Sequence, residues 1–334
     1  MSTYDIYGIG AALVDTEIDV SDEDLQQFGV EKGLMTLVDE DRQQTLVNLL
    51  EDHLVHSSRA SGGSAANTII GASYFGSSTF YSCKVASDEN GIFFLEDLKQ
   101  AQVGTHQRNG QSQGVTGKCL VMITPDSERT MNTFLGASET LSKADVDENA
   151  LKNARYAYIE GYLVTSETGR EAAITVREVA QQHGVRVALT LSDPAIAEHF
   201  SDGLREMIGA GVHLIFCNED EARAFTGTNT LEQACEVLLK VCDCFAITRG
   251  AKGALVFDGD TYSEVPGYEV AAVDTNGAGD MFAGAFLHAI SEGYSFELAA
   301  RFANKAAAKV VSQYGPRLKA DEYRSLIPVC DKQH

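Results

Sequence analysis

Hydrophobic residues recur along this chain in two patterns that alternate with one another. Short apolar runs predict strands, and stretches with apolar residues three or four positions apart predict helices. The predicted strands lie at residues 4–10, 78–85, 156–161, 185–191, 212–217 and 244–248, and the predicted helices lie at 39–56, 64–75, 89–101, 168–183, 231–241 and 280–292. This alternation indicates a mainly parallel α/β sheet of Rossmann-like type, with helices on both faces.

One segment breaks the alternation. Residues 118–124 and 130–135 look like two strands joined by Pro125-Asp126-Ser127-Glu128, which is typical of a turn. We expect a single domain over 1–334, with a small sheet built from about 12–38 and 112–137. This sheet could be a lid over a site, or a hairpin that decorates the main domain. In the helix at 89–101 we expect Ile92, Phe93 and Leu95 to form the buried face.

Composition excludes several classes of function. The 334 residues carry a net charge of −22, which argues against nucleic acid and anionic membranes as partners. No apolar run approaches the roughly 20 residues that span a bilayer, and the N-terminus lacks the basic region of a signal peptide. Seven scattered cysteines, an odd number, are typical of reduced thiols in a cytoplasmic protein, and we interpret Cys242 and Cys244 as buried thiols rather than metal ligands.

The strongest candidate for chemistry is the segment 274–280, Asp-Thr-Asn-Gly-Ala-Gly-Asp, which opens an apolar helix. Small residues let a ligand approach the backbone, and the free amides of a helix N-terminus favour an anion. A phosphate could therefore bind the amides of Gly277, Ala278 and Gly279. Asp280 could then take a proton from an attacking hydroxyl. The alternative is an ordinary glycine-rich turn with Asp280 at the positive end of the helix dipole.

Three further segments follow predicted strands or open helices. Asn218-Glu219-Asp220-Glu221 offers oxygen ligands suited to Mg²⁺, or an N-cap with its partner glutamate. Residues 248–254, with Thr248, Gly250 and Gly253, suit a loop beside a nucleotide, or a plain turn. Gly62 and Gly63 precede Asn67 at a predicted helix start, and Asp15 follows the first strand; all four could contact a ligand or serve in turns and caps.

Two familiar nucleotide-binding patterns fail. Gly8 and Gly10 resemble the start of a dinucleotide fingerprint, but Leu13 stands where the third glycine belongs. The P-loop pattern G-x-x-x-x-G-K-[ST] does not occur in the sequence. An NAD-dependent dehydrogenase is therefore disfavoured.

Taken in order, these segments resemble the signatures of the PfkB-type, or ribokinase-like, carbohydrate kinases. Residues 62–67 resemble the family's N-terminal signature, Asn218 and Glu221 its N-x-x-E motif, and residues 274–280 its D-T-x-G-A-G-D motif. The resemblance implies a Rossmann-like domain with a small β-sheet lid, and transfer of the ATP γ-phosphate to a primary hydroxyl.

The resemblance also implies a role for each matching residue. Asp280 would be the base, with the anion hole at residues 277–279, and Asn218 and Glu221 would organise Mg²⁺ and phosphate, the ion being held through water. Asp274 would hold K⁺ in those relatives that need it. The ATP site would include Asn218, Thr248, Gly250, Gly253 and Asn304, and the acceptor would be bound by Asp15, Gly62, Gly63 and Asn67.

Within the family the chain is most similar to adenosine kinases, through segments such as 32–39, 116–119, 129–133, 161–163 and 191–193. The acceptor could instead be ribose, fructose or another sugar, and a regulator without catalysis is a further alternative. No Trp is present, so Phe134, Tyr162 or Phe200 would have to stack on a purine. We expect a monomer or a homodimer.

Overall fold

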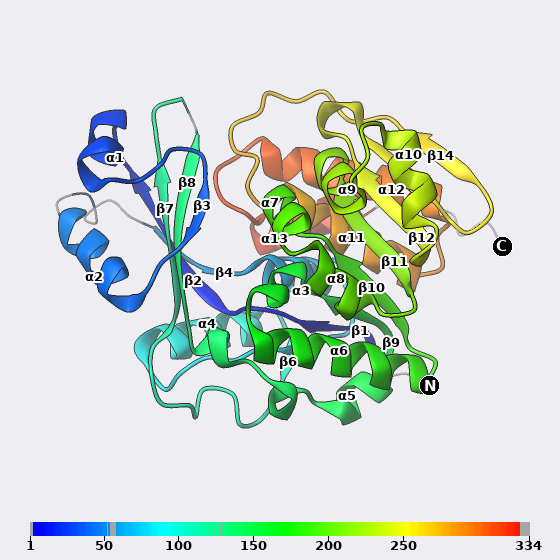
Figure 1. Cartoon of the computed structure of the whole chain (residues 1–334), viewed down its shortest axis with the longest axis horizontal. Helices are drawn as coiled ribbons and strands as arrows, with labels where there is room; N and C mark the ends of the chain where they lie inside the picture. Colours follow the sequence, from blue (N-terminus) through cyan, green and yellow to red (C-terminus); the bar gives the residue numbers. More distant parts are fainter. Residues whose placement is uncertain (1–2, 52, 54–57, 127, 328–334) are drawn as a thin grey trace.

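The computed structural model describes residues 3–51, 53, 58–126 and 128–327. Two sheets organise these residues, a nine-stranded sheet in the order β14-β13-β12-β11-β10-β9-β1-β5-β6 and a five-stranded sheet in the order β3-β8-β7-β2-β4. Figure 1 shows the small sheet to one side of the large one, with α1 and α2 against it.

The large sheet is parallel from β12 to β6, and β13 and β14 join it antiparallel at one edge. Its strands are β1 (Tyr4–Ile9), β5 (Thr79–Ser82), β6 (Gly104–Thr105), β9 (Ala154–Ile159), β10 (Arg186–Thr190), β11 (Val212–Asn218), β12 (Cys242–Thr248), β13 (Ala254–Phe257) and β14 (Tyr262–Val265). The predicted mainly parallel α/β sheet is confirmed.

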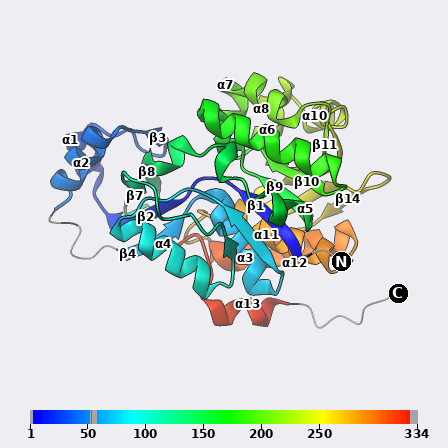
Figure 2. The same cartoon turned by 90° about the horizontal axis from the view of Figure 1, so that it is seen from below.

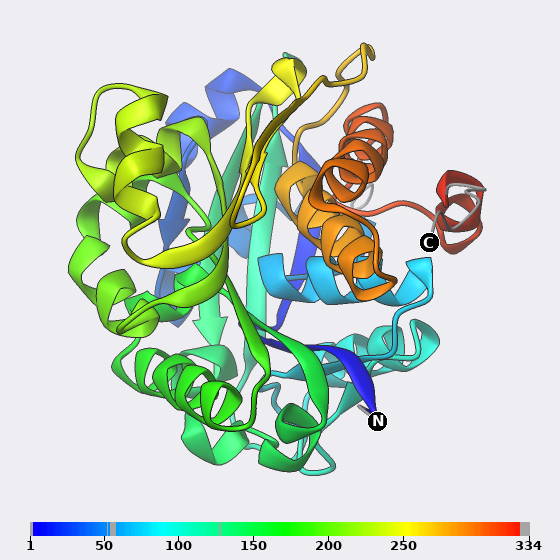
Figure 3. The same cartoon turned by 90° about the vertical axis from the view of Figure 1, so that its right-hand side faces the viewer.

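Helices cover both faces of the large sheet, as Figures 2 and 3 show. One face carries α3 (Ser64–Phe75), α4 (Glu89–Gln100), α11 (Ala278–Ser291), α12 (Phe296–Val311) and α13 (Ala320–Leu326). The other carries α5 (Glu148–Lys152), α6 (Glu167–Gln182), α7 (Pro194–His199), α8 (Ser201–Ile208), α9 (Glu219–Thr226) and α10 (Leu231–Leu238). Alternate strand residues supply the two cores: Tyr156 and Tyr158 face the first group of helices, and Ala157 and Ile159 face the second.

The small sheet contains β2 (Leu13–Asp19), β3 (Met35–Leu37), β4 (Ser58–Gly62), β7 (Thr116–Ile123) and β8 (Arg129–Gly136). The predicted hairpin corresponds to β7 and β8. The N-terminal part predicted for the small sheet, about 12–38, contains β2, α1 (Asp22–Phe28) and β3, and the sheet also takes β4, which the prediction did not include. Leu120 and Met122 of β7 pack with Leu25 and Leu46 from α1 and α2 (Glu40–Leu49), so these helices cover one face of the small sheet.

Two details of the helices differ from the prediction. The helix expected over 39–56 ends at Leu49, and residues 52 and 54–56 lie outside the described part of the chain. In α4 the fully buried apolar side chains are Phe94 and Leu98; of the three that were predicted, Phe93 and Leu95 are partly buried against the same core and Ile92 is 59% exposed. The sequence of α4 has two apolar stripes, and packing against β2, β4 and β6 decides which one is buried.

The remaining elements are short 3-10 turns, η2 (Ala137–Thr140), η3 (Lys143–Asp145), η4 (Gly161–Thr165) and η5 (Gly250–Lys252). Cys242 and Cys244 are buried free thiols, as predicted, and Cys330 lies outside the described residues. None of the helices that the structure describes has the length and apolar character needed to cross a membrane.

A close approach of α3 and α11 depends on Gly284. A Cβ on this residue would lie 2.5 Å from the carbonyl oxygen of Thr68 and 3.3 Å from the amide nitrogen of Ala72, both in the backbone of α3. Gly71, on α3 itself, has only ordinary contacts at 3.9 Å or more around its own Cβ position. The two glycines therefore differ in how much space a methyl group would find.

We predict that Gly284→Ala lowers the stability of the protein, because the added methyl group forces α3 and α11 apart at a cost of about 1–3 kcal/mol. Gly71→Ala is the matched control and should be neutral or stabilising by up to about 1 kcal/mol, since alanine is the better helix former. Urea unfolding of both variants measures the difference. Equal stability of the two variants would contradict the role given to Gly284.

Candidate active site

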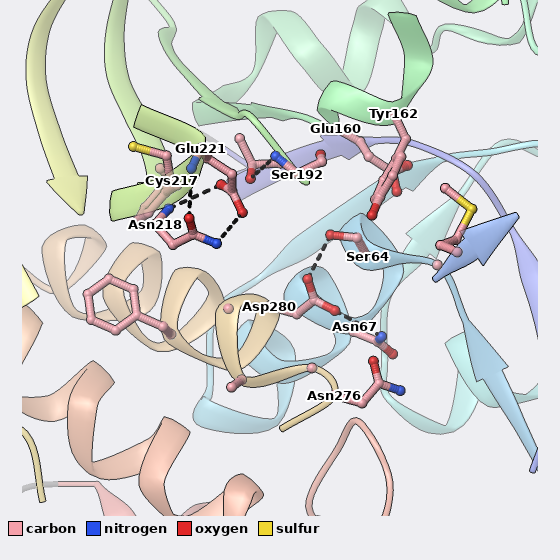
Figure 4. A pocket seen from close by; sticks show the side chains of 18 of the residues that line it. Ser64, Asn67, Glu160, Tyr162, Ser192, Cys217, Asn218, Glu221, Asn276 and Asp280 are labelled. Carbon is pink, nitrogen blue, oxygen red and sulfur yellow. Dashed lines mark hydrogen bonds between the residues drawn. The ribbon is translucent and has the colours of Figure 1, made fainter. Parts of the chain in front are cut away.

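A cavity of about 670 Å³ lies at the carboxyl ends of the parallel strands and receives residues from both sheets. Its lining combines the ends of β9 to β12, the first turns of α3 and α11, and the inner face of the small sheet. The cavity thus lies where an open α/β sheet builds its sites. Figure 4 shows its polar side chains around Asp280.

Asp280 is held at the centre of this cavity by two residues of α3. Ser64 Oγ donates a hydrogen bond to Asp280 Oδ1 at 2.6 Å, and Asn67 Nδ2 donates to Oδ2 at 3.1 Å (Figure 4). Burial raises the pKa of Asp280 to about 6, and the two hydrogen bonds oppose that rise because they favour the carboxylate. Asp280 is therefore oriented and mostly ionised at neutral pH, as a base requires.

The first turn of α11 presents backbone amides beside Asp280. Gly277 is the N-cap in the left-handed region, with φ 73°, and a Cβ there would collide with Pro316. The amides of Gly279 and Asp280 occupy positions that have no acceptor within the helix. The amide of Ala278 instead donates to the carbonyl of Thr275 at 3.3 Å, so it is less free than the sequence suggested.

Asn218 and Glu221 form the capping box that the sequence offered as an alternative, and they also line the cavity. Asn218 Nδ2 donates to Glu221 Oε1 at 2.6 Å, and burial raises the pKa of Glu221 to about 7. Glu219 and Asp220 also line the cavity but are engaged in ion pairs with Arg249 and Arg223, so the three carboxylates do not form one ligand set. One carboxylate and one amide fit a magnesium ion that keeps most of its waters.

Only part of the predicted nucleotide site lines the cavity. Thr248 and Gly250 line it, whereas Gly253 and Asn304 are absent from its described lining. Gly253, with φ 95°, packs tightly on the backbone at Val265 to Gly267. Asn304 Nδ2 donates to the carbonyl oxygens of Val265 and Pro266 at 3.1 Å each, so both residues shape the segment that follows β14.

The residues predicted to bind the acceptor gather at the other end of the cavity. Asp15 lies within β2 of the small sheet rather than simply after the first strand, and burial raises its pKa to about 7. Gly62 packs against the Asp15 carboxylate, with which a Cβ on Gly62 would collide, and it is not among the described lining residues of the cavity. Gly63 and Asn67 line the cavity directly.

Asp274 is buried beside the cavity and is already paired. Its carboxylate accepts hydrogen bonds from the Arg129 guanidinium, from Gly315 N at 2.8 Å and from Asn276 N at 3.0 Å. Arg129 also pairs with Glu17 at 3.0 Å, and so connects the small sheet to the segment before α11. Because Arg129 supplies a positive charge at Asp274, this carboxylate is not a free ligand for K⁺, and potassium dependence stays a prediction.

Glu160 is the residue that sequence reasoning missed. It directly follows β9, is 1% exposed, and accepts a hydrogen bond from Ala11 N at 2.5 Å. Burial raises its pKa to about 8. An acidic residue at the end of the apolar strand 154–159 was the available signal. Of the three aromatic residues considered for stacking, Tyr162 lines the cavity and the other two do not.

Comparisons with known proteins agree on one family. A family model described as pfkB family carbohydrate kinase matches residues 38–322. The chain belongs to this family. It is therefore an ATP-dependent phosphotransferase that acts on a sugar or nucleoside.

Individual relatives carry two kinds of name. Ribokinase of Haemophilus influenzae is 30% identical over 262 residues, covering 77% of this chain and 82% of the relative. The crystal structure of adenosine kinase from Sinorhizobium meliloti has a TM-score of 0.89 at 32% identity, with 97% of this chain and 99% of that chain covered. The crystal structure of a probable sugar kinase from Rhizobium etli has a TM-score of 0.89 at 31% identity, with 98% of this chain and 100% of that chain covered.

We predict that the stability of the unliganded kinase falls as pH rises from about 5 to 8. Glu160 has a raised pKa in the folded state, so over this range the folded chain binds more protons than the unfolded chain, and the stability given by the neutral form is lost as pH rises through about 8. The raised pKa values of Asp15 and Glu221 also make stability fall as pH rises. Glu160→Gln should flatten this dependence in melting temperature measured against pH.

The exposed residue Glu31 provides the control, and Glu31→Gln should keep the slope of the unmodified protein. If Glu160→Gln also keeps that slope, Glu160 is not protonated in the folded state.

Proposed function

We propose that the kinase transfers the γ-phosphate of ATP to the primary hydroxyl of a nucleoside, with adenosine as the leading acceptor and AMP as the product. The observation that carries this proposal is an apolar compartment at the acceptor end of the cavity, next to the polar residues around Asp280. A free sugar has hydroxyl groups on nearly every carbon and no surface to match such a compartment. A nucleoside has both a polar sugar and a flat, mostly apolar base.

The compartment is built by the inner face of the small sheet. Its described lining residues are Leu13, Met35, Leu37, Cys119, Met131 and Leu135, with Tyr162 contributed by η4. Methionine side chains adapt to flat rings, and a tyrosine ring can stack on a base. The S. meliloti adenosine kinase, similar over nearly the whole chain, supports the same acceptor.

Polar groups suited to a ribose lie between this compartment and the phosphate end. Asn67 Oδ1 is buried and has no hydrogen-bond partner among the described residues, so it can accept from a hydroxyl group. Asp15 and Glu160 present further buried carboxyl oxygens to the same space. A site with such acceptors discriminates strongly against ligands that leave them unpaired.

In the proposed reaction Asp280 takes the proton of the acceptor hydroxyl as the oxygen forms its bond to the γ-phosphorus and the bond to ADP breaks. The amides of Gly277, Gly279 and Asp280 would stabilise the charge on the transferring phosphoryl group. Ser64 and Asn67 keep the carboxylate aimed at the hydroxyl. Magnesium, held through water by Asn218 and Glu221, would neutralise negative charge on the phosphate oxygens.

The small sheet would act as a lid that closes over the acceptor and excludes water, which limits hydrolysis of ATP. Arg129 supports this role, because it pairs with both Glu17 on β2 and Asp274 beside the anion site. A cytoplasmic location and a monomeric or dimeric state stay predictions.

A sugar kinase of the ribokinase or fructokinase type is the second candidate, favoured by the ribokinase from H. influenzae. A regulator without catalysis has less support, since Asp280 is in place and oriented. An NAD-dependent dehydrogenase has even less support, because Leu13 begins strand β2 at the place where a dinucleotide fingerprint requires a helix.

The direct test is magnesium-dependent ADP release with adenosine, other nucleosides, ribose, fructose and 2-keto-3-deoxygluconate. Preference for adenosine would support the proposal, and preference for a free sugar would favour the second candidate. Nucleotide binding without turnover across the panel would favour the regulator.

We predict that Asp280→Asn lowers kcat by about 10²–10⁴, the range for loss of a general base, while nucleotide binding is kept. The amide keeps the shape of the side chain but accepts no proton at neutral pH. Asp202→Asn, an exposed change on α8, is the control and should leave kcat unchanged. An Asp280→Asn enzyme with normal kcat would remove Asp280 from the chemistry.

For the unmodified enzyme, activity should fall as pH drops below about 6, where Asp280 becomes protonated.

A further inference from the structure

Ser192 lines the same cavity in a backbone conformation that serine rarely adopts. Its φ is +72°, in the left-handed region. The two residues that flank Ser192 are hydrogen-bonded to each other, because the amide of Asp193 donates to the carbonyl oxygen of Leu191 at 2.9 Å. A turn of this kind closed around a residue with φ near +75° is rare and strained for any residue but glycine. Strain of this sort persists where function requires the side chain that causes it.

The side chain of Ser192 is also unsatisfied. Its Oγ is buried and has no hydrogen-bond partner among the described residues, although its backbone amide donates to Thr190 Oγ1 at 3.2 Å. A buried hydroxyl without a partner is destabilising, because it has given up its hydrogen bonds to water. Gly161 makes room for it, because a Cβ on Gly161 would lie 2.9 Å from the Ser192 oxygen. The fold thus tolerates both strain and an unpaired hydroxyl at this point.

The position of Ser192 along the sheet indicates what it could bind. The strands β12, β11, β10 and β9 are neighbours in that order, and their carboxyl ends present Thr248, Asn218, Ser192 and Glu160 in turn. Thr248 and Asn218 lie at the proposed nucleotide end, and Glu160 lies at the acceptor end. Figure 4 shows Ser192 between Glu221 and the pair Glu160 and Tyr162. Ser192 therefore lies where the two substrates would meet.

The charges around the cavity favour a neutral donor there. Six acidic residues are on the described lining of the cavity: Asp15, Glu160, Glu219, Asp220, Glu221 and Asp280. Arg249 is the one basic residue on the described lining, and it is paired with Glu219 and Glu264. A phosphate in this cavity would depend on amides and hydroxyl groups for its hydrogen bonds.

We propose that Ser192 Oγ donates a hydrogen bond to the γ-phosphoryl group of the bound nucleotide. This proposal rests on the proposed kinase function and adds a specific donor to it. Ser192 then distinguishes ATP from ADP, since ADP has no group at that position.

The test measures nucleotide affinity by calorimetry, with no acceptor present, for ADP and for a non-hydrolysable ATP analogue with Mg²⁺. Ser192→Ala should weaken binding of the ATP analogue about 10- to 100-fold, as expected for a lost hydrogen bond to a charged group, and change ADP affinity less than about twofold. Ser192→Gly should show the same loss, because both variants lack the hydroxyl.

Comparing these two variants separates the effect of losing the hydroxyl group from the effect of the strained backbone. Ser192→Gly should melt at a higher temperature than Ser192→Ala, since glycine accepts a positive φ. Gln102, exposed after α4 with φ +60°, is the matched control. Gln102→Gly should also melt higher than Gln102→Ala, with no change in affinity for either nucleotide.

Unchanged affinity for the ATP analogue in Ser192→Ala would overturn the proposal, as would an equal loss for ADP. Weaker adenosine binding with normal nucleotide affinity would overturn it as well, because the hydroxyl would then serve the acceptor. If the unmodified protein binds neither nucleotide, the kinase function itself fails, and this outcome is distinct from the others.

Discussion

The close packing of α3 against α11 is the constraint on which the site depends. Gly284 lets the two backbones approach, and Asp280 on α11 thereby comes within 2.6 Å of Ser64 on α3. These residues are 216 positions apart in the chain, so no local preference could hold them together. A carboxylate fixed by two donors loses little freedom when a hydroxyl group arrives, and such preorganisation is what phosphoryl transfer requires of a protein.

Charge sets the second constraint. The chain carries −22 overall, and its cavity is lined with carboxyl groups whose pKa values burial raises toward or above neutrality. A partly protonated cavity repels a triphosphate less than a fully ionised cavity would. The remaining attraction must come from helix amides, bound magnesium and hydroxyl groups, because the single arginine on the described lining is already paired. The cavity is thus arranged around neutral donors rather than basic side chains.

The small sheet contributes to the site in two ways. Its inner face supplies the apolar lining, and Arg129 connects it to Asp274 immediately before the anion site. The helices α1 and α2 cover its outer face, so its apolar residues are divided between a packed core and the cavity. A change in the position of this sheet would therefore alter both the acceptor compartment and the segment that carries the phosphate-binding amides.

The sequence by itself determined the alternation of strands and helices, the hairpin at 118–135 and the segments around Asn67, Asn218 and Asp280, because each depends on local spacing or on a short motif. Only the tertiary structure decided which residues of those segments face the cavity. Gly253 and Asn304 support the backbone after β14, Glu219 and Asp220 line the cavity but are paired with arginines, and Asp274 is paired with Arg129. Glu160 and Ser192 enter the site through strand order and a strained turn, respectively. These outcomes depend on contacts between distant segments, on burial and on backbone conformation, none of which a local pattern of residues encodes.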